Sequence, residues 1–312
     1  MKIGVFGAGG VGGYFGGRLA AAGHDVTFIA RGAHLGAIRR DGLVVSSVAG
    51  DFTVAPAAAT DDPAQVGPVD VVLLGVKTWQ LGPAITALAP MVGPDTAVLT
   101  TQNGVEAPAQ VAAAVGESAV LPGIAKIFAR IEAPGRIRHS GGPASLSFAE
   151  WDNRPSERVS ALRAALTDAH AATTAPTDIW AELWSKFLFI VPFGSLGAAL
   201  DASVGDLRVA PRRRSLLEEA MREIKALAAA QGVSLPAAIV PGTLAFFDDQ
   251  PAEATSSLQR DLLGDRPSEL DAWTGAVVRL GEAAGVPVPI HRLLLEVLTT
   301  RHPNALPHND TP

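Results

Sequence analysis

The chain has 312 residues, of which 48% are hydrophobic and 18% charged, with a formal net charge of -6 and no cysteine. This length suits two domains of ordinary size, and the composition is that of a folded protein rather than a disordered chain. The acidic balance without a long Lys/Arg run argues against a nucleic-acid partner, and the missing cysteine excludes disulfides, thiolate metal sites and cysteine nucleophiles.

The first thirty residues predict a strand, a glycine turn, a helix and a second strand. Residues 2–6 and 25–30 are short apolar runs, and residues 14–22 have a small-residue helical pattern. The glycines in this apolar start and the polar segment after it argue against a signal peptide. No window of about twenty uninterrupted apolar residues occurs, so we expect no membrane span and a cytoplasmic location.

Strands and helices continue to alternate in the next hundred or so residues. Apolar runs bounded by turn residues cover 69–76, 97–101 and 118–124, and helical patterns cover 83–91 and 107–115. Strands that alternate with helices predict a parallel sheet with helices on both faces.

The pattern then changes twice. Residues 135–150 alternate and are broken by glycines, which predicts an antiparallel hairpin that closes the first domain. After about residue 175 long amphipathic stretches predict helices, at 179–200, 212–231, 252–263 and 269–284. We therefore predict a doubly wound α/β domain over 1–175, an all-helical domain over 176–302 and a disordered tail over 303–312.

The turn between the first strand and the first helix matches the dinucleotide fingerprint GxGxxG. It consists of Gly7, Ala8, Gly9, Gly10, Val11 and Gly12. The first fingerprint glycine allows the tight turn, the second lets the backbone approach a pyrophosphate, and the third lets the helix pack on the strand. Because the motif follows a strand and opens a helix, we interpret it as a cofactor site in a Rossmann-type domain rather than a plain glycine turn.

The end of the second strand indicates which cofactor binds. NAD enzymes usually carry Asp or Glu there, whereas this chain has Ala30 and Arg31. No carboxylate would repel a 2'-phosphate and a guanidinium is available to bind it, so the sequence favours NADP over NAD. The alternative is that Arg31 is an ordinary loop arginine.

Lysine is rare in this chain, with five among the 25 Lys and Arg residues, so each retained lysine is informative. Lys77 ends an apolar strand, and Lys186 interrupts an aromatic-rich helical pattern. Ligands bind at strand ends of open parallel sheets, which makes Lys77 and Asn103, after the next strand, candidate site residues. The alternatives are a strand-end lysine that reaches solvent at Lys77 and an ion pair of Lys186 with Glu182.

Six segments together carry a family resemblance that extends from Met1 to about Pro289. They are GAGGVGGYFGGRLAAAGHDVTFIARGAHLGAIRRDGL, GVKTWQ, TTQNGVE, IRHSGGPASLSFAE, WSKF and SSLQRDLLGDRPSELD. In this order they resemble the ketopantoate reductases (2-dehydropantoate 2-reductases). The resemblance implies a Rossmann domain followed by an all-helical domain, with substrate and nicotinamide between them. It also implies NADPH-dependent reduction of 2-dehydropantoate to pantoate, in pantothenate biosynthesis.

The resemblance further implies roles for individual residues. Lys186 is similar to the family's catalytic lysine, and Glu269 to the glutamate that reaches the active site. Asn103 and Lys77 resemble the residues beside nicotinamide and substrate, and Ser257 resembles the ligand of the substrate carboxylate. From the residues alone, Ser257 could instead cap a helix and Glu269 could be a first-turn glutamate. By the same resemblance, the arginine after the second strand corresponds to the family's 2'-phosphate contact.

Three positions depart from the family pattern. The family commonly has asparagines four and eight residues after its lysine and three residues before its serine, where this chain has Ile190, Gly194 and Ala254. Each lost hydrogen bond to a buried substrate group costs about 1 to 3 kcal/mol, which disfavours 2-dehydropantoate itself. Reduction of a more apolar 2-oxo acid or ketone, or a non-catalytic NADPH-binding sensor, are therefore alternatives.

In the mechanism we expect, hydride from NADPH reaches a ketone carbon while the Lys186 ammonium stabilises the developing alkoxide and protonates it. Glu269 holds the lysine, Asn103 positions the carbonyl and the nicotinamide, and Ser257 binds the acid end. Apolar residues around the lysine favour the alternative of a more apolar 2-oxo acid or ketone if they line a pocket, but they could instead pack the helical core. They are Phe187, Phe189, Ile190 and Phe193.

Other chemistries find little support in the sequence. The histidines show no paired spacing typical of metal ligands, and no GxSxG turn occurs. We expect a small 2-oxo acid as partner, and apolar helix faces suit either a monomer core or a homodimer interface.

Overall fold

The computed structural model describes residues 1–303 and 305. The chain divides into two compact units, the first made of Met1–Gln102 and Ala107–Ile179, and the second of Asn103–Glu106 and the residues from Trp180 onward. The boundary proposed after residue 175 lies close to the end of the first unit. The expected tail at 303–312 lies outside the described residues, apart from Pro303 and Ala305.

The first unit is built on a six-stranded sheet in the order β5-β2-β1-β6-β7-β8, and all its pairings are parallel. Its strands are β1 (Lys2–Phe6), β2 (Asp25–Ile29), β5 (Ala58–Thr60), β6 (Val71–Leu74), β7 (Ala97–Thr100) and β8 (Val120–Leu121). The chain starts in the middle of the sheet, adds strands on one side and then on the other. This order confirms the predicted doubly wound parallel sheet and places the switch point between β1 and β6.

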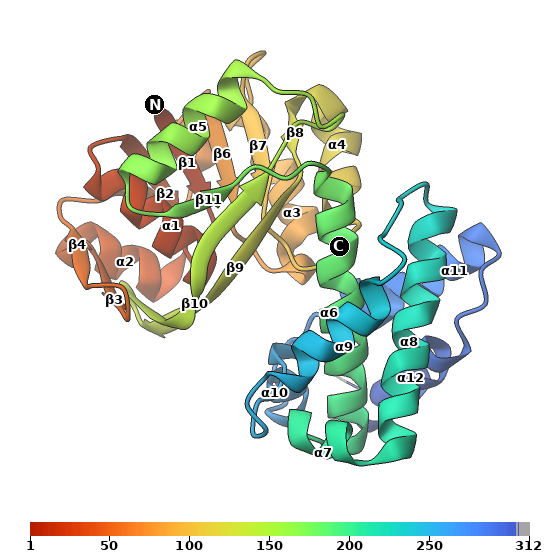
Figure 1. The fold of residues 1–312 in the computed structure, drawn as a ribbon. Helices are drawn as coiled ribbons and strands as arrows, with labels where there is room; N and C mark the ends of the chain where they lie inside the picture. The colour runs from red at the N-terminus through yellow and green to blue at the C-terminus, as the bar shows by residue number, and fades with distance from the viewer. Residues whose placement is uncertain (304, 306–312) are drawn as a thin grey trace. The chain divides into compact units, whose positions relative to one another are not determined.

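Both faces of this sheet are buried, as continuous apolar strands predict. In β6, Val71 and Leu73 enter one core while Val72 and Leu74 enter the other. The helices are α1 (Gly10–Ala21), α2 (Gly32–Asp41), α3 (Leu81–Ala87), α4 (Ala107–Val115) and α5 (Glu157–Asp168). α1 and α5 pack into the first core and α3 and α4 into the second, so helices cover the sheet on both sides (Figure 1).

A second sheet in the first unit has the order β11-β10-β3-β4, with β9 paired to β10. Its strands are β3 (Leu43–Ser47), β4 (Phe52–Val54), β9 (Gly123–Ala133), β10 (Arg136–Phe148) and β11 (Ala172–Thr174). The hairpin that we expected within residues 135–150 is instead formed by β9 and β10, which pair antiparallel. On β9, Phe128 and Ile131 are 67% and 46% exposed, so this strand lacks the alternation of buried and exposed residues that sequence analysis relies on.

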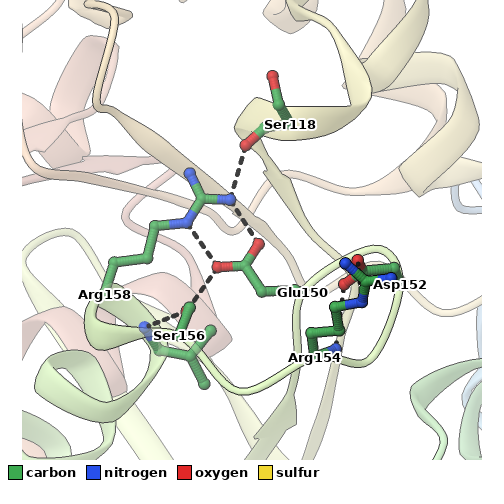
Figure 2. A network of polar contacts seen from close by, with 7 residues as sticks. Ser118, Glu150, Asp152, Arg154, Ser156 and Arg158 are labelled. Carbon is green, nitrogen blue, oxygen red and sulfur yellow. Dashed lines mark hydrogen bonds and ion pairs between the residues drawn. The ribbon is translucent and has the colours of Figure 1, made fainter.

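A network of polar contacts ties the end of β10 to the start of α5 (Figure 2). The Glu150 carboxylate accepts hydrogen bonds from Arg158 Nε at 2.7 Å and Nη2 at 2.5 Å, and from Ser156 Oγ at 2.6 Å. Arg158 also donates to the backbone oxygen of Ser118 at 2.6 Å. Burial would raise the pKa of the Glu150 carboxyl, but the hydrogen bonds from Arg158 and Ser156 outweigh it and lower that pKa. Glu150 therefore acts as an ionised anchor of the first unit.

The second unit is helical in its described residues, as predicted. Its helices are α6 (Ile179–Leu200), α7 (Val204–Val209), α8 (Pro211–Ala230), α9 (Ile239–Asp248), α10 (Ser257–Leu263), α11 (Ala276–Ala284) and α12 (Pro289–Arg301). A π-helical turn, Asp271–Gly275, leads directly into α11. By length and composition α6 could cross a membrane, but 67% of its most apolar window is buried inside the protein. We therefore interpret α6 as the core helix of this unit.

Candidate active site

The glycine turn has the backbone geometry that a dinucleotide fingerprint requires. Gly7 has a φ of +98°, in the left-handed region, and a Cβ there would lie 2.8 Å from Val76 Cγ1. A Cβ on Gly12 would lie 2.2 Å from the carbonyl oxygen of Gly7, so only glycine lets α1 start this close to β1. A Cβ on Gly9 would meet no atom within 4 Å. The backbone at Gly9 thus faces open space.

The start of α1 suits an anion. Gly9 is its N-cap, no side chain caps the helix, and no acidic residue stands in its first turn. The first N–H groups of a helix have no partner within the helix, and the helix dipole favours negative charge there. The residues present therefore fit the pyrophosphate of a dinucleotide.

Gly10, within the turn, and His34, outside it, both contact the β9–β10 hairpin. A Cβ on Gly10 would lie 2.2 Å from the backbone oxygen of Ala129, so Gly10 is required by the close approach of the β9–β10 hairpin. His34 Nδ1 accepts a hydrogen bond from the Gly135 N–H at 3.0 Å, which leaves Nε2 to donate to the Ala8 oxygen at 2.8 Å. His34 thus ties the glycine turn to the hairpin. Sequence analysis missed His34, because its role depends on Gly135, about a hundred positions away.

Arg31 lies where the adenosine end of a dinucleotide is expected. It is the N-cap of α2, directly after β2, which neighbours β1 in the sheet. Its side chain is exposed. A phosphate at the carboxyl end of β2 would therefore meet the guanidinium rather than a carboxylate. The assignment of Arg31 to a 2'-phosphate stays a prediction.

The segments that follow β6 and β7 carry Lys77 and Gln102. Lys77 follows β6 and is exposed, with Nζ 5.6 Å from the centroid of the Trp79 ring. The buried Gln102 follows β7, and its Nε2 donates to the backbone oxygens of Leu74 at 2.8 Å and Val76 at 3.0 Å. Gln102 thus fixes the segment that leads into Lys77. No motif in the sequence pointed to this amide.

Three candidate residues meet in the second unit. Lys186 Nζ on α6 donates to Asn103 Oδ1 at 2.7 Å. Asn103 Nδ2 donates to Glu269 Oε2 at 3.2 Å. Lys186 and Asn103 are half-buried, and Glu269 is 4% exposed. The amide of Asn103 therefore bridges an ammonium and a buried carboxylate, and this fixes the direction in which it presents its oxygen to Lys186.

Ser257 stands at the start of α10, and Glu269 stands just before the π-helical turn. The alternative that Ser257 caps α10 is wrong, because Ser256 is the N-cap and its Oγ accepts from the Gln259 N–H at 2.9 Å. Ser257 is the half-buried first residue of α10. Glu269 stands before the π-helical turn, and its backbone oxygen accepts from the Trp273 N–H at 2.9 Å. A substrate role for Ser257 stays a prediction.

The aromatic residues near Lys186 mostly belong to the helical core. Phe187 is 1% and Phe193 is 7% exposed, and both lie in the apolar cluster of the second unit. Phe189 is only half-buried and stacks on Phe193, with ring centroids 5.9 Å apart. Phe187 and Phe193 therefore pack the helical core rather than line a pocket. Among the described residues no group of three or more His, Cys, Asp or Glu could hold a metal ion.

Comparisons with known proteins agree along nearly the whole chain. A family model described as ketopantoate reductase PanE/ApbA matches residues 3–153, and one described as ketopantoate reductase PanE/ApbA C terminal matches residues 178–302. A 2-dehydropantoate 2-reductase of Mesorhizobium japonicum is 32% identical over 310 residues, covering 93% of this chain and 94% of the relative.

Solved structures show the same fold. The crystal structure of a PanE/ApbA family ketopantoate reductase from Ralstonia eutropha has a TM-score of 0.89 and 30% identity, covering 98% of this chain and 99% of that one. A D-mandelate dehydrogenase solved with NADH and anilino(oxo)acetate has a TM-score of 0.85 at 23% identity, with 98% and 99% coverage. At that identity the second likeness speaks for the fold alone.

Proposed function

The chain belongs to the ketopantoate reductase family, and on that premise we propose that it reduces a 2-oxo acid to a 2-hydroxy acid with NADPH. Members of this family are oxidoreductases that act on CH–OH donors. The names of the relatives make 2-dehydropantoate, reduced to pantoate for pantothenate biosynthesis, the first substrate to test. The observation that carries the proposal is the Asn103 amide, which bridges Lys186 and Glu269.

The glycine turn is the proposed seat of the cofactor. Its N–H groups at the start of α1 and the open space at Gly9 suit a pyrophosphate, and Arg31 suits the 2'-phosphate. Lys77, Asn103 and Glu269 are the proposed contacts of the nicotinamide end. NADPH, when bound, supplies the hydride that turns the ketone carbon tetrahedral and its oxygen into an alkoxide.

Lys186 is the proposed proton donor. One of its three N–H groups is donated to Asn103 Oδ1, and this bond orients the ammonium. A further N–H can point at the ketone oxygen, where the hydrogen bond strengthens as negative charge develops and the proton then moves to the alkoxide. Glu269 holds the amide of Asn103 in the orientation that accepts from Lys186. Ser257 is the proposed ligand of the substrate carboxylate.

The location and partners follow from the same proposal. A small 2-oxo acid is the proposed partner, and the buried core helix α6 and the cysteine-free chain support a cytoplasmic location.

A spectrophotometric assay tests this function. The purified full chain is mixed with NADPH or NADH and with 2-dehydropantoate or other 2-oxo acids, and loss of the reduced nicotinamide absorbance is followed. We expect oxidation that requires a 2-oxo acid and is faster with NADPH. Tight NADPH binding without reduction of any acid would instead identify a cofactor sensor.

A further inference from the structure

Three residues of α6 lie on one face of the helix because they are spaced four residues apart. Lys186 is the proposed proton donor, and Ile190 and Gly194 follow it one and two turns further along the helix. Ile190 is half-buried and packs against the apolar cluster of the second unit, and Gly194 is buried. The helix face that begins at the ammonium thus continues without a polar side chain.

The indole of Trp273 occupies the space that a side chain at position 194 would need. A Cβ on Gly194 would lie 2.9 Å from Trp273 Cζ3, 3.3 Å from Trp273 Cε3 and 3.3 Å from Ser256 Oγ. Trp273 is 2% exposed, and its ring is surrounded by the core of the second unit. Protein interiors are too closely packed for an asparagine to fit there while the indole stays in place.

Neighbouring contacts hold the indole in this position. The hydroxyls of Ser195 and Thr274, the residues after Gly194 and Trp273, are hydrogen-bonded at 2.6 Å and are fully buried. The backbone N–H of Trp273 donates to the backbone oxygen of Glu269 at 2.9 Å. The segment that carries the buried carboxylate therefore also carries the indole. The indole Nε1 has no hydrogen-bond partner among the described residues. The ring atoms nearest to position 194 are the carbons Cζ3 and Cε3, so the indole presents hydrocarbon rather than its N–H there.

We infer that Ile190 and the Gly194–Trp273 pair select a 2-oxo acid whose tail is apolar, and disfavour one whose tail carries a hydroxyl. This inference rests on the proposed function, because it takes Lys186 as the donor to the ketone. A hydroxyl moved from water onto hydrocarbon loses hydrogen bonds that nothing replaces. An apolar pocket discriminates against an added hydroxyl by up to about a hundredfold.

A matched pair of substrates tests the inference on the unmodified chain. Trimethylpyruvate is 2-dehydropantoate with a methyl in place of its hydroxymethyl group. With saturating NADPH we expect kcat/KM for trimethylpyruvate to exceed that for 2-dehydropantoate by about tenfold or more. Equal values, or a preference for 2-dehydropantoate, would overturn the inference and leave the proposed function standing. Reduction of no 2-oxo acid would overturn both.

Substitution of Ile190 gives a second test that does not rely on replacing the buried indole. Ile190→Asn puts an amide one turn from Lys186, and we expect it to shift the ratio of the two kcat/KM values by roughly tenfold toward 2-dehydropantoate. Ile190→Leu is the matched control and should keep the wild-type ratio. A mere packing defect would slow both substrates equally, and an unchanged ratio in Ile190→Asn would count against the inference.

The pair at Gly194 and Trp273 predicts a compensating effect. Gly194→Asn alone should lower the melting temperature, because its Cβ meets the ring. Gly194→Asn combined with Trp273→Leu should recover part of that loss and shift the substrate ratio toward 2-dehydropantoate. If the double variant is no more stable than Gly194→Asn alone, or if it keeps the wild-type ratio, the indole is not the determinant.

Discussion

The glycine turn in the first unit and the Lys186 cluster in the second, the two parts of the chain to which we assign function, differ in how the sequence encodes them. The turn is six consecutive residues, and its geometry lies in the backbone, such as the left-handed Gly7 and the close approach at Gly12. In the cluster, Asn103 stands 83 residues from Lys186 and 166 from Glu269. A site made of backbone can be recognised from spacing alone, whereas a site made of side chains exists only after the helices have packed.

Mutations in the two parts should affect catalysis and cofactor binding separately, and we expect the largest effect on kcat at Lys186. Replacing Lys186 by Ala removes the proposed proton donor, so we expect kcat to fall by about a thousandfold, within the usual contribution of general acid catalysis. The affinity for NADPH, measured by fluorescence titration, should stay within about twofold because the glycine turn is untouched.

A lysine elsewhere on the helical unit provides the control for this variant. Lys225 on α8 donates to the backbone oxygen of Ala237, and Lys225→Ala removes the same charge and should leave kcat unchanged. Retained turnover in Lys186→Ala would show that the proton comes from another group. A parallel loss of NADPH affinity would show that the two parts are not separable.

The second prediction separates two glycines of the same turn. Gly12→Ala brings a Cβ against a backbone oxygen that cannot move aside, so we expect about 1 to 3 kcal/mol of destabilisation and a lower melting temperature. Gly9→Ala meets open space, so the fold should keep its melting temperature while NADPH affinity falls about tenfold. Equal melting temperatures for the two variants, or full NADPH affinity in Gly9→Ala, would contradict this division of roles.

The third prediction concerns the choice of cofactor and is smaller because the residue is exposed. Arg31→Ala should weaken NADPH binding by about tenfold and leave NADH binding nearly unchanged, since only NADPH has the 2'-phosphate. The difference should shrink at high salt. Arg39→Ala, an equal change of charge on the same helix, is the control. Equal losses for NADPH and NADH would mean that Arg31 does not contact the 2'-phosphate.

The sequence predicted the parallel sheet because its strands are apolar on both faces, and it failed where a local rule was overridden. α9 was missed because Pro241 and Gly242 look like helix breakers, but Pro241 stands in the first turn, where no N–H is needed. α12 was missed because one of its core positions is polar. This residue is the fully buried His291, which is hydrogen-bonded to Glu223. In both cases tertiary context decided what composition could not.

The same limit applies to the candidate site. Residue types, rare lysines and the family resemblance selected Lys186, Asn103 and Glu269, but not the bridging role of the asparagine amide. Gln102 and Trp273 gave no signal, because each acts through contacts with residues distant in the sequence. A prediction from spacing therefore finds what the backbone encodes and misses what side chains assemble.

The smallest expected effect on catalysis comes from a residue outside both parts. Glu150 is held by Arg158 and Ser156, and the net result of burial and these bonds is a pKa below the ordinary value of a glutamate. Because the folded-state pKa is the lower one, the ionised carboxylate stabilises the fold above the unfolded-state pKa. This contribution is lost as the pH falls through the folded-state pKa.

Glu150→Gln should therefore lower the free energy of unfolding by about 1 to 3 kcal/mol at neutral pH. In acid, once the wild-type carboxylate is protonated, the difference from wild type should narrow, and urea unfolding at several pH values measures this change. Asp152→Asn, in a more exposed pair with Arg154, should change stability by less than about 1 kcal/mol at any pH. Well below the melting temperature, kcat and NADPH affinity should both stay at wild-type values in Glu150→Gln. A loss of either would show that one part of the site depends on the stability of the first unit as a whole, and the contrast between a backbone site and a side-chain site would then be incomplete.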